Sequence, residues 1–280
     1  MILNSSKIGK TYEPDFWDVT EASIVKFASG YNDLDNPRFK DGRIAPPMYA
    51  VLYAGASVFR VLFDDELNIN MMRLVHGEQD MTWHRLPRPG DRVKSVASVH
   101  NMEEKSSGEI LHVKIDSSIN DAPAGTIISS FFIRGKKKDE KPAEKKPEAA
   151  PPPRPPVAFS QKMYVTNDQT YRYAEGGGDH NPIHIDNDYA LAAGLPGIIL
   201  QGLCTMAFAH KAVTDKVLDK DPEKLRRLFV RFSKPVVPYD VLTTEGWVIE
   251  EKPGRKVVGL EVKNQDGVQV LINGRAEVDA

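Results

Sequence analysis

The chain has 280 residues, of which 41% are hydrophobic and 27% charged, a composition typical of a folded protein and not of a disordered one. Its 37 basic and 39 acidic residues give a net charge of −2, which argues against a nucleic-acid-binding protein that depends on a large basic face. The single cysteine excludes an intramolecular disulfide and any zinc site built from cysteines. We therefore expect a protein of a reducing, cytoplasmic compartment.

The first half of the chain reads as one long helix followed by strands. The N-terminus has no apolar run of signal-peptide length. The most apolar stretch, 45–63, begins with two prolines and contains Arg60, so it predicts a buried helix and no membrane span. The alternating segments 92–100 and 110–118 predict strands.

A linker separates two halves of similar length. Seven of the 20 prolines fall within 136–156, where large apolar side chains are almost absent. Such a segment cannot bury enough surface to fold alone and should be extended. The sequence therefore predicts an N-terminal domain at 1–135, a linker at 136–156 and a C-terminal domain at 157–280.

The two halves follow the same plan. Each has an Asn-Pro pair in a polar loop, then a proline turn into a long apolar helix, then strands, which in the second half lie at 242–249 and 257–262. The landmarks Asn36 and Asn181 differ by 145 positions, and Asp91 and Asp240 differ by 149. This agreement indicates a tandem duplication. We expect an α+β fold in which each repeat wraps an antiparallel sheet around its helix, so that one chain forms a pseudo-dimer.

The strongest functional signal lies in the second half. Three glycines, 176–178, end a helical stretch, and Asp179, Asn181 and His184 follow within six positions. Pro182 has a fixed φ and restricts the residue before it, so this loop should be stiff. A stiff loop with two titratable side chains suits proton transfer.

This loop carries a resemblance to a known family. The string GDHNPIHID at 178–186, with a helix, a Pro-Gly turn and QGLCT at 201–205, resembles the MaoC-like dehydratase family, in particular the (R)-specific 2-enoyl-CoA hydratases (hydratase 2). The segments HGEQ at 76–79 and RFSKPV at 231–236 resemble the two-repeat members. The resemblance implies a double hot-dog fold, in which each repeat has a long central helix.

The resemblance also implies roles for four residues. Asp179 and His184 would contact the catalytic water as an acid–base pair, and the sequence leaves open which of them takes and which gives each proton. Asn181 would hold the water or the pair in place. The backbone N–H of Gly202 would bind the thioester carbonyl of the substrate. One departure is Gln201, where the family commonly has histidine, and it leaves the local substrate contacts open.

The first half lacks the equivalent pair. At an offset of 145, Asp179 corresponds to Leu34 and His184 to Phe39, so both titratable positions are apolar. Asp33 and Asp35 lie on either side of Leu34, so a repeat alignment shifted by one residue could still place an acid at the position equivalent to Asp179. We interpret this half as a degenerate repeat that, by resemblance, makes room for the acyl chain.

Several residues of the chain allow an alternative role. Asp179, His184 and Asp186 could form a metal site, although no second histidine-rich segment completes it, and we expect no metal. Cys204 is interpreted as a buried small hydrophobic residue and not as a nucleophile. His76 and His84 are interpreted as structural residues, with His76 near the interface between the halves. Arg231 and Lys234 could meet coenzyme A phosphates or simply be charged residues at a strand end.

The sequence therefore predicts a hydro-lyase that hydrates trans-2-enoyl-CoA to (R)-3-hydroxyacyl-CoA. The alternatives are a dehydratase of the same fold acting on 3-hydroxyacyl-acyl-carrier protein or on a branched or dicarboxylic acyl-CoA, and a non-catalytic protein that binds acyl thioesters. No cofactor is expected, because neither hydride nor electron moves and coenzyme A belongs to the substrate. A homodimer stays open, because hot-dog sheets often associate but a duplicated chain can already satisfy that interface.

Overall fold

The computed structural model describes residues 3–135 and 154–280. The first range contains β1 (Asp15–Asp18), α1 (Glu21–Gly30), α2 (Pro37–Lys40), α3 (Ala50–Leu62), β2 (Leu74–Trp83), β3 (Arg92–Lys105), β4 (Gly108–Ile119) and β5 (Ala122–Arg134). The second contains β6 (Phe159–Tyr164), α4 (Gln169–Gly177), α5 (Asn187–Ala192), α6 (Gly202–Val217), β7 (Leu225–Phe232), β8 (Val241–Lys252), β9 (Arg255–Lys263) and β10 (Gln269–Val278). Single 3-10 turns lie at Ser5–Lys7, Pro47–Tyr49, Asp65–Leu67, Met71–Arg73, Pro182–His184 and Pro222–Lys224.

The predicted helices and strands are confirmed. The apolar stretch after the first proline pair forms α3, and the four predicted strand segments lie within β3, β4, β8 and β9. Most of the predicted linker, 136–153, lies outside the described residues, so the domain boundaries stay a prediction.

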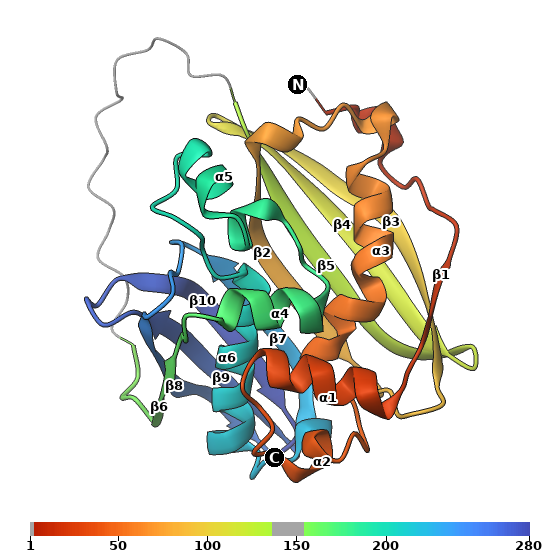
Figure 1. The fold of residues 1–280 in the computed structure, drawn as a ribbon. Coiled ribbons are helices and arrows are strands. Elements are labelled where there is room, and N and C mark those ends of the chain that lie inside the picture. Colours follow the sequence, from red (N-terminus) through yellow and green to blue (C-terminus); the bar gives the residue numbers. More distant parts are fainter. Residues whose placement is uncertain (1–2, 136–153) are drawn as a thin grey trace.

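The ten strands form one antiparallel sheet in the order β1-β3-β4-β5-β2-β7-β10-β9-β8-β6 (Figure 1). Outward from the centre, the first half runs β2-β5-β4-β3-β1 and the second β7-β10-β9-β8-β6, so each strand has a counterpart at the same distance from the middle. The central pair, β2 and β7, places Met81 opposite Leu228. Two units of one topology that share a sheet in this way confirm the predicted α+β pseudo-dimer.

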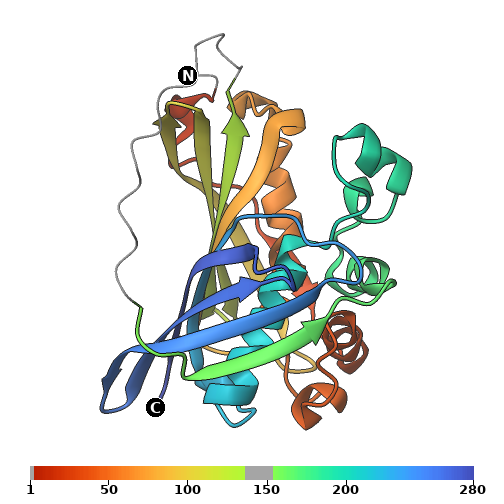
Figure 2. The same cartoon turned by 90° about the vertical axis from the view of Figure 1, so that its left-hand side faces the viewer.

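The helices lie on one side of the sheet (Figure 2). Strand residues alternate between buried and more exposed positions along β4, as expected of a sheet with one face against the core. α3 leaves Phe59 and Arg60 exposed, whereas every residue of α6 from Cys204 to Thr214 is buried. The second half therefore wraps its central helix more completely than the first.

α1 and α4, the counterparts from the two halves, pack against each other (Figure 1). A Cβ added at Gly176 would lie 2.8 Å from the Lys26 carbonyl oxygen, and one at Gly30 would lie 3.2 Å from the Arg172 carbonyl oxygen. The glycines therefore let the two backbones approach closely. Because α4 leads directly into the Asp179 loop, this contact holds that loop against the first half.

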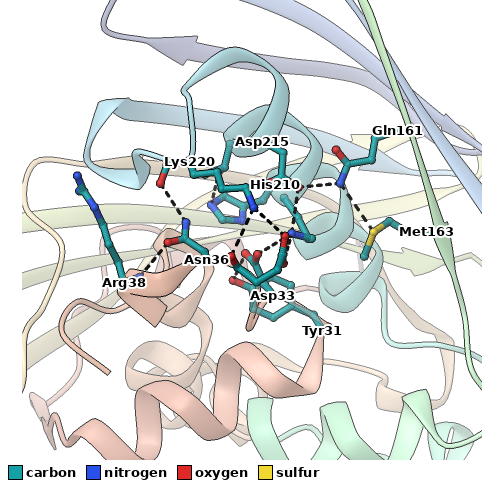
Figure 3. Close-up of polar contacts among 12 residues, drawn as sticks. Tyr31, Asp33, Asn36, Arg38, Gln161, Met163, His210, Asp215 and Lys220 are labelled. Atoms are coloured by element: carbon teal, nitrogen blue, oxygen red, sulfur yellow. Dashed lines mark hydrogen bonds and ion pairs between the residues drawn. The ribbon is translucent and has the colours of Figure 1, made fainter. Parts of the chain in front are cut away.

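A buried ionic cluster also joins the halves. Lys211 Nζ of α6 lies 2.9 Å from Asp33 Oδ1, 2.5 Å from Asp35 Oδ1 and 3.0 Å from Asp215 Oδ2. Figure 3 shows Asp33 and Asp215 within this network of polar contacts. The Lys211 and Asp33 side chains are only 6% and 1% exposed. Burial raises the pKa of Asp33 to about 6, although the Lys211 charge opposes this shift. A buried ammonium needs such partners, because an unpaired charge in the interior is very unfavourable.

We expect Lys211→Met to lower the free energy of unfolding by about 3–5 kcal/mol, because it leaves three carboxylates without their shared cation. Denaturant unfolding at neutral pH measures this loss. Lys220→Met is the matched control, since Lys220 contacts Asp35 at 3.0 Å but is 44% exposed and should cost about 1 kcal/mol or less. Equal losses in both variants would contradict the assigned role of the buried lysine.

Candidate active site

Asp179 and His184, the predicted acid–base pair, lie together in the structure. His184 Nε2 is 3.6 Å from Asp179 Oδ2. The His184 side chain is 8% exposed and the Asp179 side chain 31% exposed, so one member is enclosed and the other reaches solvent. The two groups therefore stand at the edge of the protein interior, where a substrate can reach them.

Local hydrogen bonds make the loop that carries this pair. α4 ends at Gly178, whose φ of +77° is favourable only for glycine or a few small polar residues. Asp179 Oδ1 accepts a hydrogen bond from the Asn181 N–H at 3.2 Å. Asn181 Oδ1 in turn accepts from the Ile183 N–H at 3.3 Å, which starts the turn Pro182–His184. The exposed Asn181 side chain thus builds the turn that presents His184, and the role predicted for it in holding water stays a prediction.

The hydrogen bonds of His184 indicate its tautomer. Its Nδ1 lies 2.7 Å from the Ile199 carbonyl oxygen, so a proton on Nδ1 satisfies that contact. In the neutral ring Nε2 is then an acceptor, and it faces the Asp179 carboxylate at a distance longer than a direct hydrogen bond. Two acceptors separated in this way suit a water molecule that donates to either of them.

Burial sets the charge of His184. Burial lowers the pKa of the His184 imidazole below its ordinary 6.5, while the nearby Asp179 charge and the hydrogen bond to Ile199 oppose the shift. The neutral imidazole is therefore the stable form at neutral pH. It is the form that can accept a proton.

Gly202 is the first residue of α6. The first N–H groups of an α-helix have no partner within the helix, so the Gly202 N–H is available to an oxygen acceptor. A Cβ on Gly202 would come within 3.2 Å of the Phe232 ring, so a larger residue would crowd this point. The backbone N–H predicted to bind a thioester carbonyl thus lies beneath an aromatic ring at the end of β7.

The first half contributes His76 to the same region. Its ring packs between Phe131 at 4.8 Å and Phe232 at 5.0 Å, and its Nε2 lies 2.9 Å from Gln79 Oε1. Burial lowers the pKa of His76 to about 4, although the Asp179 charge acts on it in the opposite direction. Sequence reasoning placed His76 near the interface between the halves, which is confirmed, but it missed that the ring packs on Phe232, the residue that lies against Gly202. The HGEQ segment at 76–79, which resembles the two-repeat members of the family, was the sequence signal that could have indicated this position.

The equivalent loop of the first half has kept its shape. Asn36 Oδ1 accepts from the Arg38 N–H at 3.1 Å and starts α2, as Asn181 starts its own turn, which supports the offset of 145. Phe39, in place of the histidine, is fully buried. The acids that left the register open, Asp33 and Asp35, are the ones paired with Lys211. They serve the interface between the halves.

The remaining predicted residues have simpler positions. Asp186 Oδ1 accepts from the Tyr189 N–H at 3.0 Å and caps α5. Cys204 is fully buried and burial raises the pKa of its thiol, which confirms a small core residue. Arg231 and Lys234 are exposed, and Arg231 Nε lies 3.9 Å from Glu78 Oε1. A role for these two cations in binding phosphate stays a prediction.

Within residues 3–135 and 154–280, one group of three potential metal ligands lies close enough to share an ion: Asp33, Asp35 and Asp215. Lys211 already contacts all three carboxylates. Asp179, His184 and Asp186 do not form such a group, so the geometry favours acid–base chemistry at this loop.

Comparison with known proteins identifies relatives that span both halves of the chain. Residues 148–269 match the family model described as MaoC like domain, and residues 6–127 match that described as FAS1-like, dehydratase domain region. A probable enoyl-CoA hydratase 2 from Dictyostelium discoideum is 32% identical over 251 residues, which are 85% of this chain and 82% of that protein. The chain belongs to the MaoC-like dehydratase family. The 3-hydroxyacyl-thioester dehydratase Y of Mycobacterium tuberculosis is 30% identical, and the alignment covers 99% of both chains.

Solved structures support the fold of this MaoC-like dehydratase. The crystal structure of a MaoC-like dehydratase from Phytophthora capsici superposes with a TM-score of 0.80 over 99% of this chain and 98% of that one, at 24% identity. The predicted double hot-dog fold is thereby confirmed. Because the relatives named above are hydratases and dehydratases, the chain is an enzyme of the hydro-lyase class. Within the described ranges no helix is both long and apolar enough to cross a bilayer, and the cytoplasmic location stays a prediction.

The pKa of His184 predicts how the activity of this MaoC-like dehydratase depends on pH. Since the pKa lies below 6.5, the neutral imidazole is the major form at pH 6.5, and the imidazolium becomes the major form only at lower pH. We expect kcat/KM to fall at low pH with a midpoint below pH 6.5, because the imidazolium cannot accept a proton. A loss of activity centred at or above pH 6.5 in the pH profile would contradict this assignment.

Proposed function

We propose that the protein catalyses the reversible hydration of trans-2-enoyl-CoA to (R)-3-hydroxyacyl-CoA. The observation that carries this proposal is the pair of Asp179 and His184, whose Oδ2 and Nε2 atoms lie 3.6 Å apart on one loop. The relation to an enoyl-CoA hydratase 2 over most of both chains supports the same substrate class.

The pair supplies the proton transfers of the reaction. The oxygen of water attacks C3 of the enoyl thioester while a proton leaves the water for the Asp179–His184 pair. The pair delivers a proton to C2, so that no proton is gained or lost overall. Because the two groups titrate together, they act as one unit. The reverse reaction uses the same groups and removes water from the 3-hydroxyacyl thioester.

The start of α6 supplies the electrostatic stabilisation. Attack at C3 moves negative charge onto the thioester oxygen, and the Gly202 N–H is the donor we assign to that oxygen. Such a donor typically lowers the barrier by about 3 kcal/mol. No cofactor is required by this chemistry, since coenzyme A is part of the substrate and no electron or hydride is transferred.

The second candidate is dehydration of a 3-hydroxyacyl group on a different carrier or with a branched or dicarboxylic chain. It is favoured by the relation to a 3-hydroxyacyl-thioester dehydratase over 99% of both chains. The reaction centre is the same in both candidates. An activity panel that varies the carrier and the acyl chain distinguishes them, whereas a protein that only binds thioesters would turn over none of these substrates.

We expect Asp179→Asn and His184→Ala each to lower kcat by at least about a hundredfold, the usual scale for removing an acid–base group. The measurement is the loss of ultraviolet absorbance as a conjugated enoyl thioester is hydrated, followed by chiral analysis of the alcohol. His180→Ala is the matched control, because His180 is exposed and contacts Glu175 at 3.1 Å on the surface.

The control variant should retain the wild-type rate, and the product should be the (R)-alcohol. Folded Asp179→Asn or His184→Ala protein with a rate near that of the wild type would refute the mechanism. An (S)-product would refute the assigned stereochemistry. The acid–base assignment would then still be tested by the rates of the Asp179→Asn and His184→Ala variants.

A further inference from the structure

Gln201 occupies a fully buried position between the two parts of the proposed site. It directly precedes Gly202, and its carbonyl oxygen accepts from the Cys204 N–H at 3.0 Å and the Thr205 N–H at 3.2 Å in the first turn of α6. Its side chain is 0% exposed. The backbone of Gln201 is therefore fixed to the start of the helix that carries the Gly202 N–H.

The side-chain amide of Gln201 reaches two other segments. Its Nε2 donates to the Thr170 carbonyl oxygen at 3.0 Å and to the Asp179 carbonyl oxygen at 3.3 Å. A carboxamide nitrogen has two N–H donors, so one side chain can satisfy both carbonyls. The amide thus ties α4 and the Asp179 loop to the first residue of α6.

The orientation of this amide is determined by its surroundings. The opposite orientation would place Oε1 against two carbonyl oxygens, which cannot donate to it. In the observed orientation Oε1 is buried and has no hydrogen-bond partner among the described residues, and the same holds for Thr170 Oγ1 and Tyr173 Oη on α4. An apolar residue of similar size would leave no such unpaired oxygen, but it would also remove the donor shared by the Thr170 and Asp179 carbonyls, so the specific contribution of the amide is the link between these two segments.

We propose that Gln201 is a positioning residue that fixes the distance between Asp179 and the Gly202 N–H. This inference rests on the proposed hydratase function, because it matters only if both groups act on one substrate. Among residues 3–135 and 154–280, the Asp179 carboxylate contacts the Asn181 N–H and His184, both on its own loop, so its location depends on its backbone, which Gln201 holds. Where the family commonly has histidine, a neutral imidazole has one N–H and can reach only one of the two carbonyls.

The experiment compares Gln201→Leu with Gln169→Leu. Gln169 is the matched control, because it is also fully buried and its Nε2 donates to a backbone carbonyl, that of Gly30 at 2.5 Å, but it does not contact the Asp179 loop. We expect Gln201→Leu to lower kcat by about tenfold to a hundredfold with KM changed by less than about threefold, as for a displaced catalytic group. Gln169→Leu should keep kcat within about threefold.

Two further variants keep the test decisive if Gln201→Leu does not fold. Gln201→Glu has the same shape but cannot donate when ionised, so its kcat relative to wild type should rise as the pH falls and the carboxyl gains a proton. Gln201→His keeps one donor and should retain more activity than Gln201→Leu. A merely structural role predicts neither the pH-dependent recovery nor this order.

Amide hydrogen exchange of residues 178–181 provides a readout that needs no activity. Faster exchange there in Gln201→Leu but not in Gln169→Leu, together with the fall in kcat, supports the proposal. Unchanged kcat in folded Gln201→Leu overturns it, whatever the exchange shows. If wild-type protein has no activity, or Asp179→Asn is fully active, the proposed function fails, and unchanged exchange in Gln201→Leu then overturns the positional link as well.

Discussion

Five residues of β2, Glu78 to Thr82, pair with five residues of β7 in the middle of the sheet. The position of the site residues of one half relative to those of the other depends on this pairing of β2 with β7. It brings His76 of the first half against Phe232 of the second, and Phe232 lies over Gly202. Arg227 donates to both carboxylate oxygens of Asp80 across the same pair, at 2.8 and 2.6 Å. A slip by one residue would turn each of these side chains to the other face of the sheet, so the register of one strand pair determines the shape of the site.

The central helix of the second half imposes a second constraint. α6 is buried along most of its length, so a polar side chain on or beside it is stabilised by hydrogen bonds or ion pairs within the protein and not by water. Lys211 forms ion pairs with carboxylates of the first half, and Gln201 donates hydrogen bonds to two backbone carbonyls. The buried His184 ring forms a hydrogen bond with the carbonyl of Ile199. The contacts that satisfy these buried polar groups thus stabilise both the interface between the halves and the loop that carries the proposed acid–base pair.

The two repeats share one local turn structure, but the turn has a different role in each. Each begins a short turn with an asparagine that accepts from a backbone N–H two residues later. In the second half this turn presents His184 towards Asp179. In the first half Phe39 enters the core instead, and the adjacent Asp33 binds the ammonium of Lys211. The degenerate loop is therefore an anchor for the helix that carries the proposed oxyanion donor.

The sequence alone determined the duplicated plan, the long helix and strands of each half, and the loop with Asp179, Asn181 and His184. These features depend on neighbouring residues: a proline restricts its own turn, an asparagine caps the next residues, and apolar periodicity marks a buried face. Only the tertiary structure decided that His76 packs on Phe232 of the other half, that Lys211 binds Asp33 across 178 positions, and that Gln201 joins two segments. Such contacts arise from strand register and helix packing between distant segments, and spacing along the chain does not encode them.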